Sequence, residues 1–156
     1  MALTIEKTIE ELSELIRFDL DAIGAYDTAI EGLKEAAARD PLIQFRGDHQ
    51  RHVTELSAIV VRLGGTPPDR PDLKGLARKA MTKMAGVGGD ELILKAMRSN
   101  EELLNKTYAH HFVLDFPDDI KETIRRNYMD EQRHLAWVES ALQGRVWERQ
   151  APTVQP

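Results

Sequence analysis

The sequence contains no cysteine among its 156 residues. A disulfide framework, a thiolate zinc site and a cysteine nucleophile are therefore excluded, and the chain suits a reducing compartment. Long apolar runs are missing as well, because no run exceeds four residues, as from Ala58 to Val61, far too few to cross a bilayer. The first residues show no basic stretch followed by an apolar core, so no secretory signal is expected. Together these absences predict a cytoplasmic protein that does not act at a membrane.

Basic residues are too few for a general nucleic-acid binder. The 21 lysines and arginines are outnumbered by 26 aspartates and glutamates, which gives a formal net charge of −5 at pH 7. Binding to nucleic acid depends on an excess of positive charge, so no nucleic-acid partner is expected. With 42% hydrophobic and 30% charged residues the composition is that of a globular protein, and the length suits one domain.

Apolar residues recur at alternating spacings of three and four along most of the chain. This pattern is typical of helices that each bury one face, and no segment alternates with the period of two that a strand requires. Asp40 followed by Pro41 is typical of an N-cap and a first helical residue. The sequence therefore predicts an all-α protein with four amphipathic helices, roughly over residues 4–38, 41–63, 90–115 and 119–143.

The connections between these helices differ in length. The first and the third are short, which places the joined helices antiparallel, whereas residues 64–89 form a long connection with a short helical run inside it. The pattern predicts two helical hairpins joined by a long crossover. We expect residues 1–143 to form the bundle, and residues 144–156, which lack periodicity, to form a C-terminal tail on its surface.

The chain matches itself, without a gap, at an offset of 82 residues. Each half carries an acid, a tyrosine seven residues later and, 30 residues after the acid, the first of two polar residues that lie three apart. Two hairpins related in this way can pack about a pseudo-twofold axis that brings the repeated side chains together. The matched pairs are Asp19 with Glu101, Tyr26 with Tyr108, His49 with Glu131, and His52 with His134.

The acids and histidines of this repeat all fall on helix faces that are otherwise apolar. Burying an unpaired carboxylate is costly, so three carboxylates and three histidines on related faces require a shared partner. A divalent cation would be such a partner, and histidine together with carboxylate suits zinc, iron or manganese. The alternative is a polar layer in which buried histidines pair with acids across the core. Because both halves carry the pattern, a metal site is the preferred hypothesis.

Two further acids, Asp48 and Asp130, lie one position off these faces, at matching places in the repeat. We expect them to be solvated. The alternative is that they contact the histidines from outside and orient the imidazole rings.

The heights of the candidate residues along the bundle give a mixed result. Glu101 and the polar pair of the fourth helix are equally distant from the turn expected near Pro117, so they share a level. Asp19 shares a level with the histidines of the second helix only if the first helix ends near Gly32. A turn at Pro41 would place this acid away from them.

The segment EQRH at residues 131–134 forms an E-x-x-H motif on the last predicted helix, and a single glutamate, Glu101, lies on the helix before it. With the doubled arrangement and the long crossover, residues 4–143 resemble the ferritin-like superfamily, most nearly its rubrerythrin and bacterioferritin branch. The resemblance implies a ferritin-like four-helix bundle with a di-metal carboxylate site in its core, holding iron, or zinc or manganese instead. The ligands that it implies are Asp19, His49, His52, Glu101, Glu131 and His134.

Two of these positions depart from the family pattern. His49 stands where the resemblance implies a second bridging glutamate, and Asp19 is one methylene shorter than the usual glutamate. The site then offers a charge of −3 from Asp19, Glu101 and Glu131, whereas two divalent ions would need −4 for balance. A single ion, an altered two-ion site and a site that no longer binds metal therefore all stay open.

Tyr26 and Tyr108 occupy positions at which such proteins carry tyrosines near the ligands. The resemblance implies that they take part in catalysis by tuning the site, and packing in the core is the alternative. The implied function is that of a metal-binding protein, whose partners would be metal ions and a small oxidant if it is an iron, oxygen or peroxide oxidoreductase. The competing hypothesis is a metal-free structural or stress-associated interaction module. A homodimer is expected from fold analogy alone.

Overall fold

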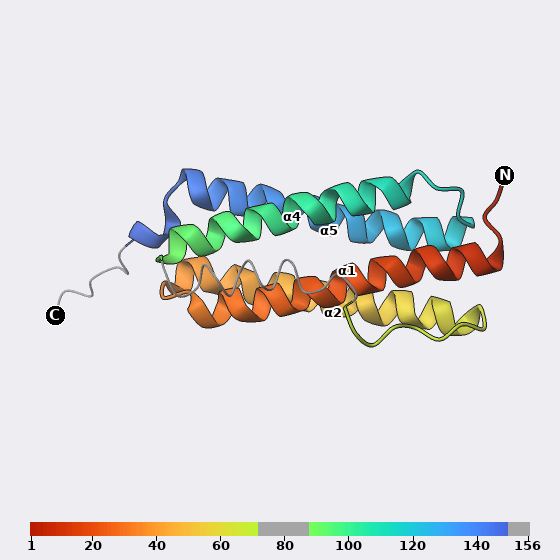
Figure 1. The fold of residues 1–156 in the computed structure, drawn as a ribbon. Helices are drawn as coiled ribbons and strands as arrows, with labels where there is room; N and C mark the ends of the chain where they lie inside the picture. Colours follow the sequence, from red (N-terminus) through yellow and green to blue (C-terminus); the bar gives the residue numbers. More distant parts are fainter. Residues whose placement is uncertain (72–87, 150–156) are drawn as a thin grey trace.

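The computed structural model describes residues 1–71 and 88–149. No strand occurs within these ranges, so the prediction of an all-α protein is confirmed, and none of the helices is both long and apolar enough to cross a membrane. The short helical run predicted in the long connection falls on residues 72–87, outside the described residues. The elements are α1 (Ile5–Gly32), α2 (Ala36–Arg62), α4 (Asp90–Phe112), α5 (Asp118–Gln143) and the short 3₁₀ helix η1 (Val146–Glu148) (Figure 1).

The four long helices form two antiparallel hairpins that pack against each other. α1 lies along α2 and α4 lies along α5, and a short turn joins the members of each pair (Figure 1). α2 and α4 run in the same direction, so the end of α2 and the start of α4 lie at opposite ends of the bundle (Figure 1). For a helix of 27 residues that distance is about 40 Å. The predicted arrangement of two hairpins joined by a long crossover is confirmed.

The first turn lies earlier in the chain than the sequence pattern predicted. α1 ends at Gly32 instead of residue 38, and α2 begins at Ala36, so Pro41 lies inside α2 and the predicted N-cap at Asp40 is wrong. Pro41 is tolerated because it is only the sixth residue of the helix, where its missing N–H costs a single helical hydrogen bond. The early end of α1 is the condition that brings Asp19 level with the histidines of α2.

A contact from the second hairpin fixes the position of this turn. The carboxylate of Asp90, the first residue of α4, accepts hydrogen bonds from the backbone N–H groups of Lys34 and Glu35, at 3.0 and 2.9 Å. Asp90 is buried, and it lies 55 residues from Glu35 in the chain. Local sequence patterns carry no trace of such a distant partner, which is why the turn was predicted at the nearest proline.

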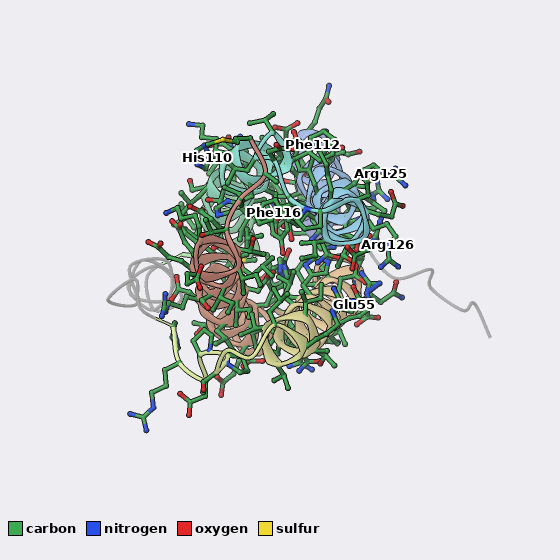
Figure 2. All side chains as sticks on the ribbon, turned by 90° about the vertical axis from the view of Figure 1, so that its right-hand side faces the viewer. Glu55, His110, Phe112, Phe116, Arg125 and Arg126 are labelled. Atoms are coloured by element: carbon green, nitrogen blue, oxygen red, sulfur yellow. The ribbon has the colours of Figure 1, made fainter. Side chains whose placement is uncertain are left out.

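Apolar side chains fill the bundle in two clusters that lie on either side of its middle. The cluster near the α1–α2 turn includes Leu42 and Met97, and the cluster toward the opposite end includes Leu15 and Ile124. Between them every long helix contributes buried polar side chains. Viewed along the bundle axis, the helices surround an interior filled with side chains (Figure 2). Hydrocarbon therefore encloses the polar layer from both ends.

The first residues of the predicted tail lie on the bundle. η1 packs against α2, with Val146 buried and Trp147 partly buried beside the cluster near the α1–α2 turn. The predicted boundary between bundle and tail at residue 143 stays a prediction.

The Asp90 contact predicts a stability effect at a position far from the polar layer. Replacing Asp90 with alanine leaves two backbone donors without their charged acceptor, so we expect the free energy of unfolding to fall by about 2 kcal/mol. Urea denaturation followed by circular dichroism measures this change. Glu91→Ala is the matched control, because it removes a partly exposed acid from the same first turn. Equal losses in the two variants would show that Asp90 does not anchor the turn.

Candidate metal centre

The middle layer of the bundle brings together all six side chains that the repeat predicts as metal ligands. Each is completely buried, with 0% of its surface exposed. The residues on α2 and on α5 come in pairs three apart, so both members of a pair point to the same side of their helix. The six are Asp19 on α1, His49 and His52 on α2, Glu101 on α4, and Glu131 and His134 on α5.

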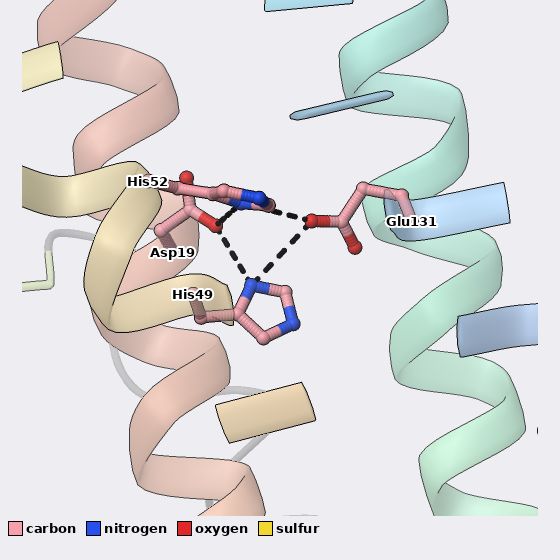
Figure 3. A group of neighbouring side chains, drawn as sticks. All are labelled: Asp19, His49, His52 and Glu131. Carbon is pink, nitrogen blue, oxygen red and sulfur yellow. Dashed lines mark hydrogen bonds and ion pairs between the residues drawn. The ribbon is translucent and has the colours of Figure 1, made fainter. Parts of the chain in front are cut away.

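Four of these residues form a first group around the carboxylate of Asp19 (Figure 3). Its Oδ1 lies 2.8 Å from Nδ1 of His49 and 3.2 Å from Nδ1 of His52. Oε1 of Glu131 reaches the same two nitrogens from the other hairpin, at 3.5 and 3.3 Å. Two carboxylates from opposite hairpins therefore converge on two imidazoles of α2.

A second group consists of His49, Glu101, Glu131 and His134, and its atoms are less closely paired. Nε2 of His49 lies 3.7 Å from the carboxylate of Glu101, and Nδ1 of His134 lies 3.8 Å from both glutamates. Among the described residues, every member of this group has a buried atom without a hydrogen-bond partner. These atoms are Nε2 of His49, Oε2 of Glu101, Oε1 and Oε2 of Glu131, and Nδ1 of His134.

The two groups share His49 and Glu131, so they define adjacent positions. In each group one nitrogen or oxygen atom per residue lies within 4.8 Å of the corresponding atoms of the other members. His49 faces the first group with Nδ1 and the second with Nε2, and the two oxygens of Glu131 divide in the same way. The layer thus offers four donor residues to each of two neighbouring cations. That these residues are metal ligands stays a prediction.

The two tyrosines hold the outer carboxylates of the layer. The hydroxyl of Tyr26 donates to Oε1 of Glu101 at 2.5 Å, and that of Tyr108 donates to Oδ2 of Asp19 at 2.6 Å. Burial, reinforced by these carboxylates, raises the pKa of both phenols well above the usual value, so both remain donors. Each bond occupies one carboxylate oxygen and leaves the other, Oε2 of Glu101 or Oδ1 of Asp19, directed at the histidines.

Asp48 and Asp130 contact the histidines, so the expectation that they are solvated is wrong. Oδ2 of Asp130 lies 3.0 Å from Nε2 of His52, and Oδ2 of Asp48 lies 2.8 Å from Nε2 of His134. An imidazole ring is wide enough to reach from the buried layer to a carboxylate at the helix surface. Because the outer nitrogen of each ring is bound, the ring is held with its inner nitrogen, Nδ1, facing the layer. Metal-binding histidines are commonly oriented in this way, by a hydrogen bond at the ring nitrogen that does not bind the metal.

These contacts repeat with the two hairpins exchanged. Tyr26 of the first half donates a hydrogen bond to Glu101 of the second half. Tyr108 of the second half donates one to Asp19 of the first half. His52 and His134 bond Asp130 and Asp48 of the opposite half in the same way, and Arg51 and Arg133 bond the same two aspartates. The internal repeat is therefore a pseudo-twofold arrangement in space. The string shared by the two halves, D-x-Q-R-H, was the signal that could have identified the aspartates and arginines as partners.

Positive charge for the buried carboxylates comes from the histidines. Burial disfavours an imidazolium, but the carboxylates around His49, chiefly Glu131, outweigh burial and raise the pKa of His49 to about 10. Burial likewise opposes protonation of His52, yet Asp19 and Asp130 raise its pKa to about 11. In the protein alone, these two histidines are therefore charged at neutral pH.

The carboxylates respond to the same charges. Burial works against the ionisation of Asp19 and of Glu131, but the neighbouring histidines hold the pKa of both below the usual range. Burial and the charge of Glu131 instead raise the pKa of Glu101. The pKa of His134 is also raised, since Asp48 and Glu131 outweigh its burial. Three imidazolium groups can thus balance the three carboxylates when no other cation is bound.

A third group of acids and a histidine lies away from this layer, on α1 and α4. Nε2 of His111 is 3.1 Å from Glu11 and 3.6 Å from Glu14, whose side chain is half exposed. The ammonium group of Lys7 lies 2.9 Å from the other oxygen of Glu11. Because a lysine already supplies positive charge here, we assign no metal position to this group.

The fold and the layer define the class of this protein: an all-α four-helix bundle with a histidine–carboxylate cluster buried in its core. A family model described as "Domain of unknown function (DUF2383)" matches residues 7–111, and the chain belongs to this family. The matched range includes four of the six candidate ligands, whereas α5, with Glu131 and His134, lies beyond it. No curated protein and no solved structure matches the chain.

The raised pKa values predict how stability depends on pH in a metal-free preparation. A histidine whose pKa rises from 6.5 to about 10 or 11 on folding stabilises the fold fully below pH 6.5 and loses this contribution as the pH rises through the folded-state value. Between pH 7 and 9 we expect the free energy of unfolding to fall by roughly 1.4 kcal/mol per pH unit for each such histidine.

Urea denaturation in the presence of EDTA at several pH values measures this slope. His52→Gln is expected to make the slope shallower, while His110→Gln, which changes an exposed histidine, leaves it as it is. A free energy of unfolding that stays constant from pH 7 to 9 would mean that the buried histidines are neutral.

Proposed function

We propose that this chain is a ferritin-like protein that binds divalent metal in the buried layer. The support comes from two hairpins joined by a long crossover, from the E-x-x-H segment on α5 and from the ligand-type side chains that all four helices direct into one level. This combination is what the resemblance to the rubrerythrin and bacterioferritin branch implies.

The observation that carries the proposal is the set of unpartnered atoms in the second group. Buried polar atoms in proteins are nearly always hydrogen-bonded, because leaving one without a partner costs about 1–3 kcal/mol. Here four adjacent residues each contribute at least one such atom, and all of these atoms are of the types that bind metals. A cation bound among them would satisfy the four residues together.

The donor set favours iron, zinc or manganese, because it combines imidazole nitrogen with carboxylate oxygen and contains no sulfur. With the histidines neutral, three carboxylates carry −3, so one divalent ion would leave the layer at −1 and two would leave it at +1. Both loadings are close to balance. We propose iron as the natural metal on the strength of the resemblance, and we propose Glu131 and His49 as the residues shared when two ions bind.

The residues around the ligands suit a metal that reacts with a small oxidant. When bound, iron would supply the electrons for reducing oxygen or peroxide. The chain's own contribution would be to keep bulk water out with the two apolar clusters and to hold the carboxylates through Tyr26 and Tyr108. Both phenols keep their protons, so they orient Glu101 and Asp19 without adding negative charge.

A second candidate function is a metal-free bundle that serves as a structural or stress-associated interaction module. One observation favours it: protons on the histidines alone can balance the buried carboxylates. In that case the polar contacts of the layer would fix the register in which the two hairpins pack against each other.

Metal analysis of selected variants distinguishes residues that bind the metal from residues that do not. In Glu131→Gln and His134→Gln we expect the bound metal, measured by mass spectrometry after purification without chelators, to fall at least about tenfold, since losing a ligand costs more than losing an outer partner. Glu139→Gln is the matched control, because this glutamate is exposed on the same helix. Metal content that is the same in all three variants and the natural chain would refute the assigned ligands.

Thermal melting with and without chelator separates the two functions. A metal present at about 100 times its dissociation constant stabilises the native state by about 2.7 kcal/mol, which corresponds to a rise in the melting temperature of about 5–10 °C for a chain of this length. We therefore expect EDTA to lower the melting temperature and added metal to restore it. A melting curve that does not respond to either would support the metal-free module.

A further inference from the structure

The internal repeat places candidate ligands at equivalent positions of the two halves. The residues that flank these ligands differ between the halves. At the offset of 82 residues, Asn127 corresponds to Phe45, and Glu55 corresponds to Trp137. One side of the layer is therefore flanked by two aromatic residues, and the other side, at the equivalent positions, by an amide and a carboxylate. Since the repeat relates the two sides, each serves as a control for the other.

Aromatic rings close the layer on the side of His134. The ring of Phe45 stacks on the imidazole of His134 with centroids 4.4 Å apart, and Trp137 packs edge-on against Phe45 at 5.7 Å. Arg133 lies over the same phenylalanine, with its guanidinium carbon 5.6 Å from the ring centre. Phe45 is only 4% exposed. No opening of molecular size is expected through this packing.

The side of His52 has an open pocket of about 280 Å³ between α2 and α5, which we call the Asn127 pocket. Glu55 of α2 and Arg126 of α5 are labelled in Figure 2, and Nη2 of the arginine lies 3.9 Å from Oε2 of the glutamate. Asp130, whose carboxylate contacts Nε2 of His52, forms part of the wall, so the pocket reaches the outer partner of a candidate ligand. The lining residues are Arg51, Glu55, Arg126, Asn127, Met129 and Asp130.

Asn127 separates this pocket from the buried layer. Its side chain is 1% exposed and lies one helical turn before Glu131, on the same face of α5. The amide interacts with the hydroxyl of Tyr108, but neither Oδ1 nor Nδ2 makes a hydrogen bond of normal geometry within the described part of the chain. Oε2 of Glu55, at the mouth, is also buried without a hydrogen bond, although it is ion-paired with Arg126 at 3.9 Å. Polar atoms that make no hydrogen bond thus lead from the mouth of the pocket to the layer.

We propose that the Asn127 pocket is the access site through which a hydrated divalent cation reaches and leaves the layer. This inference rests on the proposed metal binding. Oxygen atoms of Glu55, Asn127 and Asp130 can accept hydrogen bonds from the water molecules of an aqua ion along the way. The two arginines at the pocket are ion-paired with Glu55 and Asp130, so they leave no net positive charge to repel a cation. Asn127 permits passage of the ion on this side of the layer, whereas Phe45, at the equivalent position of the other half, blocks it.

Rapid-mixing measurements with cobalt(II) test the proposal. The rate of Co²⁺ binding to the metal-free protein and the rate of its removal by excess EDTA are followed by the absorption of the bound ion. In Asn127→Phe, which copies the covered half, we expect both rates to fall by about tenfold or more. Because Asn127 is not among the six candidate ligands, the dissociation constant should stay within about twofold.

Two further variants keep the test decisive if the larger side chain disturbs folding. Asn127→Leu removes both polar atoms with little change in size and is expected to slow both rates too, while Phe45→Asn opens the other half and is expected to accelerate them. Lys121→Phe is the matched control, because it adds an aromatic ring at a separate surface pocket of α5. Binding with unchanged rates in every Asn127 variant would overturn the access site alone. If the natural chain binds no Co²⁺, the proposed function fails together with it.

Discussion

Six ionisable side chains share one buried layer, and the balance of their charges constrains the rest of the bundle. A carboxylate removed from water is tolerated only beside a cation or a hydrogen-bond donor, so each helix has to deliver its side chains at the same height. The early end of α1 meets this requirement for Asp19, and the phenols meet it for the outer carboxylate oxygens. Protons on imidazole and divalent ions are two ways of satisfying the same constraint, which is why both candidate functions fit one architecture.

The layer also links the two hairpins through polar contacts. Within a hairpin, packing along α1 and α2, or α4 and α5, is extensive, and Asp19 adds polar contacts to both histidines of α2. Between the hairpins, the layer adds the contacts of the tyrosines and of the outer aspartates. His52 and His134 each bond an aspartate of the opposite half, and each tyrosine bonds the opposite acid, so a shift of one residue between hairpins would break several charged contacts at once. Directional polar bonds specify register more strictly than hydrocarbon does.

Sequence alone predicted the parts of this protein that repeat locally or at a constant offset. Alternating spacings of three and four identified the helices, and the offset of 82 identified the six residues of the layer. The turn at Leu33 was missed because Asp90, a distant residue, fixes it. Asp48 and Asp130 were expected to be solvated because helical periodicity places them outside the buried face, and periodicity ignores the reach of an imidazole ring. The Asn127 pocket was missed because it lies where the repeat fails.

The contact between His49 and Glu131 has a consequence for the ancestry of the bundle. These residues occupy matched positions of the two halves, and Nδ1 of the histidine lies 3.5 Å from Oε1 of the glutamate, close to the pseudo-twofold axis. In a dimer of identical hairpins, a residue on the axis can meet only its own copy, which would set two like charges face to face. Duplication and fusion of a hairpin gene would remove that restriction. Once a crossover joins the two hairpins in one chain, the two matched positions can carry different residues, here a base in one half and an acid in the other. In a symmetric dimer both positions would carry the same residue.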